Sequence, residues 1–340
     1  MPSAHLPTPE NFGALRTHMV DGRVESRLER LQLDQLTGGD VVLRTLHAGV
    51  NYKDCLSLHG QAKIITRFPR IAGIELVGEV IESSAARFRR GQPVLVHGLQ
   101  TGIDFDGGFS EIVRVPEAHI HPLPEGLSPH QAAVLGVPAF TAAMALERFE
   151  ELGITPDKGT VALSGASGAV GLMALGVFAR AGYQVAAITR DAAAKGQALQ
   201  QAGAHEVIDA EVLAQAQRPL EKARFSAAID NVGGPMLSWL LRSMQDSGCV
   251  ASVGNAAGNS FDGSVLPFIM RRVQLFGIVA NAPWPQRQRL WARLGQDLKP
   301  DFERLLPQVR QIRLGELMAH SALQLKGMTS GRVLVGFGSW

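Results

Sequence analysis

The chain has 340 residues, which is longer than one ordinary globular domain of roughly 100–200 residues, so we expect two domains that each bury a core. Its composition, with 46% hydrophobic residues, 19% charged residues and a formal net charge of +2, is typical of a soluble globular protein and is not basic enough to indicate nucleic acid, so small molecules are the expected partners. No apolar run approaches the roughly 20 residues that a membrane-spanning helix needs, and the N-terminus lacks a basic region followed by an apolar core, so we expect no membrane association and a cytoplasmic location.

Short β-type runs fill the first third of the chain. They cover residues 40–50, 75–82, 92–98 and 109–115, and turns rich in Gly, Pro and Asp separate them. This spacing predicts a small, barrel-like first domain.

The pattern changes after Pro138. An Ala-rich helical segment at 139–152 is followed by short apolar runs that alternate with longer helical stretches. Such alternation is the signature of parallel β–α–β units, and the number of runs predicts a six-stranded, doubly wound α/β sheet. The runs are 160–164, 184–189, 205–209, 226–232, 249–254 and 274–280.

The C-terminal part of the chain does not continue this alternation. Residues 283–298 are helical in pattern and rich in Arg and Gln, and they lead to a strand-like run at 331–337 that has no partner among the six runs. We therefore expect the chain to return to its first domain, which predicts one domain of 1–137 with 281–340 and a second of 138–280.

A glycine-rich segment, 164–171, follows the first of the six strands and precedes a helical run. Gly165 and Gly168 would let backbone amides approach a pyrophosphate, Gly171 would let helix and sheet pack closely, and the helix N-terminus adds partial positive charge. This order of strand, glycine turn and helix predicts a dinucleotide site. The predicted cofactor-binding residues here are Ser164, Gly165, Ser167, Gly168, Ala169, Val170 and Gly171, together with Asn231, Gly254 and Asn255 further along the chain.

The end of the second strand indicates which dinucleotide is bound. NAD-binding chains usually carry an acidic residue there, but this strand ends in Thr189 and Arg190. A guanidinium can pair with a 2′-phosphate that a carboxylate would repel, so Thr189 and Arg190, with Lys195 nearby, predict NADPH. If Asp191 rather than Arg190 faced the ribose, this preference would relax or reverse; alternatively, Arg190 and Lys195 are ordinary surface charges.

Two common dehydrogenase chemistries do not fit the sequence. A zinc-dependent enzyme needs thiolate and imidazole ligands, but Cys55 has no companion at ligand spacing and Gly73-Ile74-Glu75 lacks the histidine of a Gly-His-Glu motif. We therefore expect no metal, and we expect Cys55 and Cys249 to be free thiols. The two tyrosines, Tyr52 and Tyr183, are not followed four residues later by the Lys that a short-chain dehydrogenase requires.

Several motifs in order along the chain resemble the medium-chain dehydrogenase/reductase superfamily, in its zinc-free quinone-oxidoreductase branch. Within that branch the chain is most similar to the acryloyl-CoA reductase group of NADPH-dependent enoyl-thioester reductases, and the resemblance covers nearly the whole length. The segments that carry it are Val50-Asn51-Tyr52-Lys53-Asp54, Arg67-Phe68-Pro69, Ala72-Gly73-Ile74-Glu75, the glycine segment 164–171, and Leu266-Pro267-Phe268-Ile269 with Arg271.

The resemblance implies a GroES-like β-barrel substrate domain, a Rossmann domain that binds NADPH, and a homodimer built through the nucleotide domains. It also implies hydride delivery to an activated C=C bond, with hydrogen-bond donors stabilising the charge on the carbonyl oxygen. Asn51 and Asp54 are then the predicted catalytic residues. Asn51 would hold the substrate carbonyl or the nicotinamide carboxamide, Asp54 would orient a donor or a water, and Tyr52 would pack on the nicotinamide or donate a proton. The alternative is a polar turn, with Asn51 in a left-handed conformation and Asp54 capping the next helix.

Some positions depart from the pattern that the family usually shows. These are Cys55, Ala72, Glu75 and the pair Val279-Ala280, where the family usually has Ala, Pro, Asp and Asp-Ser. They leave the particular substrate open. Arg67, Arg271 and Arg332 could meet phosphates of coenzyme A or NADPH, although pairing with nearby acids at the surface is the simpler expectation for each.

Two other functions stay open at this point. The chain could reduce quinones or free alkenals, since enzymes of the same branch do so without a coenzyme A handle. It could also be a non-catalytic protein that binds NADPH. Retention of Asn51 and Asp54 beside a complete glycine segment argues against the second.

Overall fold

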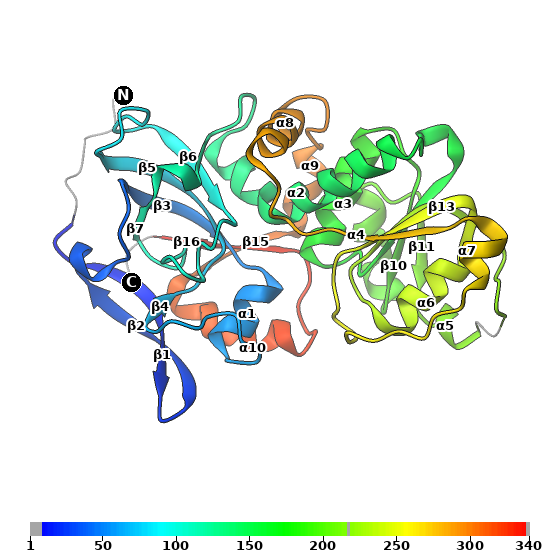
Figure 1. The fold of residues 1–340 in the computed structure, drawn as a ribbon, viewed down its shortest axis with the longest axis horizontal. Coiled ribbons are helices and arrows are strands. Elements are labelled where there is room, and N and C mark those ends of the chain that lie inside the picture. Colours follow the sequence, from blue (N-terminus) through cyan, green and yellow to red (C-terminus); the bar gives the residue numbers. More distant parts are fainter. Residues whose placement is uncertain (1–8, 216–217, 338–340) are drawn as a thin grey trace. The chain divides into compact units, whose positions relative to one another are not determined.

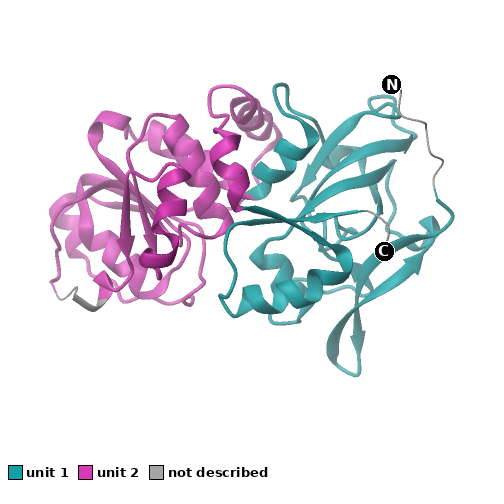
Figure 2. Ribbon diagram, turned by 180° about the vertical axis from the view of Figure 1, so that it is seen from behind, with its two compact units in different colours: residues 1–137, 309–340 teal, residues 138–308 magenta. Residues whose placement is uncertain are grey.

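The computed structural model describes residues 9–215 and 218–337, and these fall into two compact units. Unit 1 comprises Met1–Val137 with Val309–Trp340, and unit 2 comprises Pro138–Gln308 (Figure 2, teal and magenta). The first boundary lies where we predicted it, but the predicted return to unit 1 at residue 281 is wrong. The chain stays in unit 2 until residue 308 because α8 (Trp284–Gly295) packs on α2 (Pro129–Glu151), where Trp291 stacks on Phe140.

Unit 1 is built mainly of β-strands (Figure 1). Its larger sheet has the order β15-β16-β3-β5-β6-β8, with β7 also paired to β3, and its smaller sheet has the order β2-β1-β4. The C-terminal strand β16 is antiparallel to β3, which confirms that the run at 331–337 finds its partner in the first unit. The elements are β1 (Phe12–Val20), β2 (Arg23–Leu31), η1 (Leu33–Gln35), β3 (Val41–Gly49), α1 (Tyr52–Leu58), β4 (Arg70–Ile71), β5 (Glu75–Ser83), β6 (Pro93–His97), β7 (Ile112–Val115), η2 (Glu117–His119), β8 (Ile120–Pro122), β15 (Val309–Arg313), η5 (Leu314–Glu316), α10 (Leu317–Leu325) and β16 (Arg332–Gly336).

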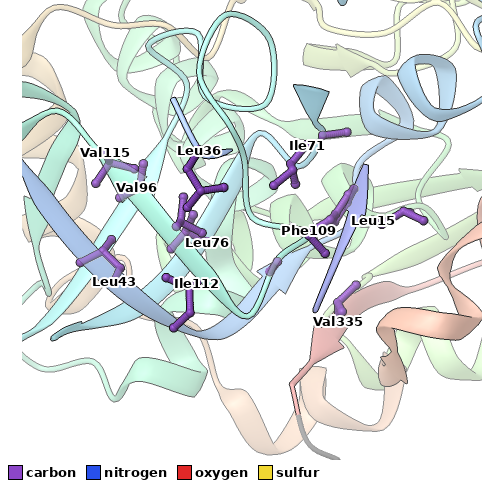
Figure 3. Packing of buried hydrophobic residues seen from close by; sticks show 14 of the residues in the cluster. Leu15, Leu36, Leu43, Ile71, Leu76, Val96, Phe109, Ile112, Val115 and Val335 are labelled. Atoms are coloured by element: carbon purple, nitrogen blue, oxygen red, sulfur yellow. The ribbon is translucent and has the colours of Figure 1, made fainter. Parts of the chain in front are cut away.

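The core of unit 1 lies between these strands. Leu43 of β3, Leu76 of β5, Val96 of β6 and Val335 of β16 are buried in one apolar cluster, part of which Figure 3 shows. Strands β6 and β16 contribute alternate side chains to the cluster, as the two-residue period of a strand requires, whereas β3 contributes the consecutive residues 41–43, where its pairing with β5 shifts register. The cluster fixes the register of β3 and β5. The polar residues of the candidate site of unit 1 lie at the ends of these two strands.

Unit 2 contains a six-stranded parallel sheet in the order β11-β10-β9-β12-β13-β14, as predicted. The chain builds outward from β9 in one direction and then restarts at β12 in the other, so the strand order reverses between β9 and β12. Ligands of such sheets bind beyond the carboxyl ends of the strands at that reversal. The elements are η3 (Pro156–Lys158), β9 (Thr160–Ser164), α3 (Ala169–Arg180), β10 (Val185–Thr189), α4 (Ala192–Gln201), β11 (Glu206–Asp209), α5 (Val212–Gln215), β12 (Phe225–Asp230), α6 (Gly234–Ser243), β13 (Met244–Ser252), α7 (Leu266–Arg271), β14 (Gln274–Gly277), α8, α9 (Phe302–Leu305) and η4 (Leu306–Gln308).

Helix α2 spans the boundary between the units. It is interrupted at Gly136, whose backbone angles of φ 47 and ψ −155 are not helical. Among the described residues it is the one helix whose length and composition would suit a membrane span, and 83% of its apolar window is buried within the protein. A buried core helix meets the same criteria.

Candidate functional site

The glycine segment of unit 2 joins β9 to α3 at the reversal of strand order. Gly165 has a φ of +58, which an L side chain rarely adopts, so glycine is required for the turn itself. A Cβ on Gly171 would lie 2.5 Å from Cα of Ala166. Glycine at this position therefore lets α3 approach the glycine loop, whereas we had expected it to let the helix approach the sheet. Gly168 is the N-cap of α3 and has no side chain to cap it, which leaves the first-turn amides for a ligand.

Asp230, at the end of β12, organises the far side of this loop, and the sequence analysis did not identify it. Its Oδ1 accepts a hydrogen bond from Ser164 Oγ at 2.6 Å and another from Val232 N at 3.1 Å, while Oδ2 accepts one from Gly233 N at 2.9 Å. Burial raises the pKa of Asp230, and these hydrogen bonds oppose the increase. Ser164, predicted to bind the cofactor, is fully buried, and its hydroxyl donates to Asp230, so it links the loop to the end of β12.

The predicted residues Asn231, Gly254 and Asn255 gather beside Asp230. Asn231 donates from Nδ2 to Ser164 O at 2.8 Å, and its Oδ1 is buried with no hydrogen-bond partner among the described residues. Gly254 N donates to Asp230 O at 3.1 Å, and a Cβ on Gly254 would lie 2.5 Å from Asn231 O. Asn255 follows directly. The ends of β9, β12 and β13 therefore meet at one edge of the sheet, as parallel strands require.

The structure separates the roles of the charged residues after β10. Asp191 Oδ1 accepts a hydrogen bond from Ala194 N at 2.9 Å and so caps α4. Its carboxylate is therefore engaged with the helix, whereas Arg190 is exposed and Thr189 is buried at the strand end. Lys195 Nζ lies 3.5 Å from Ser167 Oγ, which places its positive charge against the glycine segment. These residues fit a dinucleotide with an additional phosphate.

The candidate site of unit 1 begins at the junction of β3 and α1. Asn51 is the N-cap of α1 with extended backbone angles, φ −118 and ψ 157, so the left-handed conformation considered for it is wrong. Asp54 accepts a hydrogen bond from Asn51 N at 3.0 Å on Oδ2 and one from Ile74 N at 2.9 Å on Oδ1. Asp54 is therefore part of the capping box at the start of α1, as the alternative interpretation expected. Asp54 is 1% exposed, and burial raises its pKa to about 7.

A buried ion pair lies directly behind Asn51. Glu75 Oε1 is 2.7 Å from Arg332 Nη2 and also accepts a hydrogen bond from Asn51 Nδ2 at 2.7 Å. Glu75 Oε2 accepts one from Val137 N at 2.6 Å. We expected surface pairing or a phosphate contact for Arg332, and both are wrong because its side chain is fully buried in unit 1. The sequence signal that could have suggested this pair is the departure at Glu75 together with the unpartnered C-terminal strand.

Other residues singled out from the sequence lie elsewhere. Tyr52 is 39% exposed on α1, and Arg67 is exposed. Arg271 donates to the carbonyl oxygens of Arg242, Met244 and Glu221 at 2.6–3.0 Å, so it holds the end of α6 and is not available to a phosphate. Val279 is 74% exposed after β14.

The two cysteines are buried free thiols, and burial raises the pKa of both. For Cys249 the pKa rises to about 12. Within residues 9–215 and 218–337, no three His, Cys, Asp or Glu side chains are grouped so that they could hold a metal ion.

A dinucleotide-type loop at the reversal of a parallel sheet, in a chain with a separate β-rich unit, defines a class of nucleotide-dependent oxidoreductases. Two family profiles match the chain: "Alcohol dehydrogenase GroES-like domain" over residues 37–125 and "Zinc-binding dehydrogenase" over residues 169–295. The chain belongs to the medium-chain dehydrogenase/reductase superfamily, as the motifs predicted, and is an oxidoreductase.

The relatives that the chain resembles carry two different names. It is 36% identical over 327 residues to YhfP of Bacillus subtilis (strain 168), named as a candidate quinone oxidoreductase, with 95% of this chain and 98% of YhfP covered. It is 35% identical over 316 residues to acrylyl-CoA reductase AcuI of Ruegeria pomeroyi, with 92% and 95% covered. The crystal structure of the yhdH oxidoreductase from Salmonella enterica in complex with NADP has a TM-score of 0.90 at 35% identity, covering 96% of this chain and 100% of that one.

Proposed function

We propose that this protein uses NADPH to reduce an activated C=C bond, in the first instance that of an enoyl-CoA thioester such as acryloyl-CoA. The observation that carries the substrate class is the likeness to acrylyl-CoA reductase AcuI over 92% of the chain. The similar likeness to YhfP supports quinone reduction as the second candidate.

The cofactor assignment rests on the charges after β10. Solved structures similar to this chain contain NADP or NADPH, in yhdH of Salmonella enterica and of Escherichia coli, and NAD, in yhfP of Bacillus subtilis. Here Asp191 is engaged in capping α4, which leaves Arg190 and Lys195 as the charges for a 2′-phosphate. The amides at the start of α3 would hold the pyrophosphate, and Asn231, Gly254 and Asn255 would line the same edge of the sheet.

Bound NADPH supplies the hydride. We propose that Asn51 binds one of the reacting partners through its carboxamide and that Asp54, although predicted as catalytic, acts through Asn51, because Asp54 is buried and hydrogen-bonds to it twice. With a pKa of about 7, Asp54 can hold a proton near neutral pH without an unpaired buried charge. The half-exposed Tyr52 would offer its hydroxyl or ring to the cofactor.

We also propose that the protein is a homodimer joined through unit 2. Several large apolar side chains are exposed there, and β14 is the last strand of its sheet, which leaves one edge without a partner strand among the described residues. These side chains are Val265 at 67%, Ile269 at 67%, Met270 at 63% and Val279 at 74% exposed. The cytoplasmic location stays a prediction.

The deciding experiment follows NADPH oxidation with acryloyl-CoA, acrolein and a quinone as separate acceptors, and repeats each with NADH. A thioester reductase should lose much of its rate with acrolein, because binding energy from the coenzyme A portion supports the reacting centre. Faster turnover of the quinone than of acryloyl-CoA would replace the first candidate with the second. If none of the three acceptors supports oxidation of NADPH, both candidates are removed.

A further inference from the structure

The hydrogen bonds around Asn51 fix which end of its carboxamide is free. Its Nδ2 donates to Glu75 Oε1 at 2.7 Å and to Asp54 Oδ2 at 3.3 Å. An amide nitrogen carries two hydrogens, so both are directed at carboxyl groups of the protein. Oδ1 faces the backbone amide of Asp54 in the capping box of α1 and has a second lone pair, so it is the atom of this side chain that can still bind another molecule, and it can only accept a hydrogen bond.

Glu75 is held so that it cannot release Asn51 by turning. Oε2 accepts from Val137 N at 2.6 Å, and Oε1 is shared between Arg332 Nη2 and Asn51 Nδ2, each at 2.7 Å. The carboxylate is 2% exposed, so water does not compete for these bonds. Three protein groups, Arg332 Nη2, Asn51 Nδ2 and Val137 N, donate to this carboxylate, so Glu75 acts only as a hydrogen-bond acceptor toward Asn51.

Arg332 is fixed in turn by backbone carbonyls. Its Nε donates to Val134 O at 3.1 Å and its Nη2 donates to Ala133 O at 2.9 Å. Two glycines make room for the pair: a Cβ on Gly49 would collide with Arg332 and Glu75, and a Cβ on Gly136, whose φ is +47, would collide with both as well. Gly49 and Gly136 therefore let the backbone approach the ion pair closely at two places.

We propose that Glu75, held by Arg332, is a positioning residue that sets the polarity of Asn51, so that Asn51 binds a ligand group that donates a hydrogen bond, namely the carboxamide NH2 of the nicotinamide. This inference rests on the proposed function. It decides between the two roles considered for Asn51, because a carboxamide that presents Oδ1 cannot donate to a substrate carbonyl oxygen. Stabilisation of that oxygen must then come from another group.

The test uses cofactor binding and does not depend on turnover. NADPH is compared with its 3-acetylpyridine analogue, in which a methyl group replaces the carboxamide NH2, and dissociation constants are measured by calorimetric titration. We expect wild-type protein to bind NADPH about five- to tenfold more tightly than the analogue, as one hydrogen bond allows. Asn51→Ala, Glu75→Gln and the double variant should all bring this ratio close to one, since Glu75 acts through Asn51.

The matched control is Asp106→Asn. Asp106 belongs to a second buried ion pair of unit 1, with Arg70 at 3.1 Å, and has no hydrogen bond to Asn51. This variant should keep the wild-type ratio even if it is less stable. If Glu75→Gln does not fold, it is combined with Arg332→Met, because the double variant removes the carboxylate beside Asn51 without leaving an uncompensated guanidinium in the core.

A wild-type ratio near one, or a Glu75 variant that keeps the wild-type ratio, would overturn the proposal. So would a further loss when Glu75→Gln is added to Asn51→Ala, since that result would show an effect not transmitted through Asn51. A protein with the expected binding ratios that fails to reduce acryloyl-CoA would leave this inference intact and remove the substrate class.

Discussion

Arg332 and Glu75 are 257 residues apart in the sequence and form a fully buried ion pair in the structure, with Nη2 and Oε1 2.7 Å apart. The pair joins the C-terminal strand β16 to the start of β5, and through Val137 N it also holds the chain just before the boundary of unit 1. Breaking one partner leaves an uncompensated charge in the core.

We therefore expect Arg332→Met to be strongly destabilising. Loss of one partner of a buried pair typically costs about 3–5 kcal/mol, because the remaining charge has lost its compensation. Thermal unfolding of the variant measures this cost. Adding Glu75→Gln to Arg332→Met should restore part of the stability, since it removes the isolated carboxylate, and a double variant less stable than the single one would contradict this explanation.

Gly136→Ala should destabilise the protein for two reasons. Its φ of +47 is unfavourable for an L residue, and the added Cβ would collide with Glu75 and Arg332. We expect a loss of roughly 2 kcal/mol or more in denaturant unfolding. Gly38→Ala is the matched control, because the φ of Gly38 lies outside the left-handed region and an added Cβ would meet no atom within 4 Å, and it should change stability by less than about 0.5 kcal/mol.

The raised pKa of Asp54 predicts how stability depends on pH. In the folded protein the pKa is about 7, against 3.8 for an ordinary Asp, so between these values the folded state binds a proton that the unfolded state has lost. This contribution makes stability fall as pH rises from about 4 to about 7 and then level off. The difference between the two pKa values corresponds to at most about 4 kcal/mol.

Unfolding measured across this pH range should fall less steeply for Asp54→Asn than for the wild type. Asp209→Asn serves as the control of opposite sign. Hydrogen bonds from Ala192 N and Glu211 N lower the pKa of Asp209, so its contribution is lost as pH falls through that lowered value. Identical pH profiles for wild type and Asp54→Asn would contradict the assignment.

Arg190→Ser should weaken NADPH binding about 10- to 100-fold while leaving NADH binding nearly unchanged, since the lost partner is that of the 2′-phosphate. Fluorescence titration with both cofactors measures this. Asp191→Ala is the comparison, because it removes the cap of α4 and should cost about 1 kcal/mol of stability without altering the cofactor preference. Equal losses for NADPH and NADH in Arg190→Ser would exclude a specific phosphate contact.

Much of unit 2 could be predicted because its signals are local. The run at 160–164 is β9 to the residue, and the glycine segment lies where it was predicted. Strand β13 begins at Met244, five residues before the predicted 249, because the polar residues Gln245 to Ser247 do not read as a strand. Helix α8 was assigned to the wrong unit, since an amphipathic pattern shows that one face is buried and does not identify the surface that covers it.

The sequence by itself determined the succession of elements, the dinucleotide loop and the likeness to the superfamily, because each depends on neighbouring residues or on an ordered set of short motifs. Only the tertiary structure decided what the individual polar groups do. Glu75 was one departure from a pattern and Arg332 one arginine among several, and their pairing behind Asn51 follows from antiparallel pairing of β3 with both β5 and β16. Such contacts join distant parts of the chain, so no local pattern encodes them, and burial then turns the pair into the group that orients Asn51.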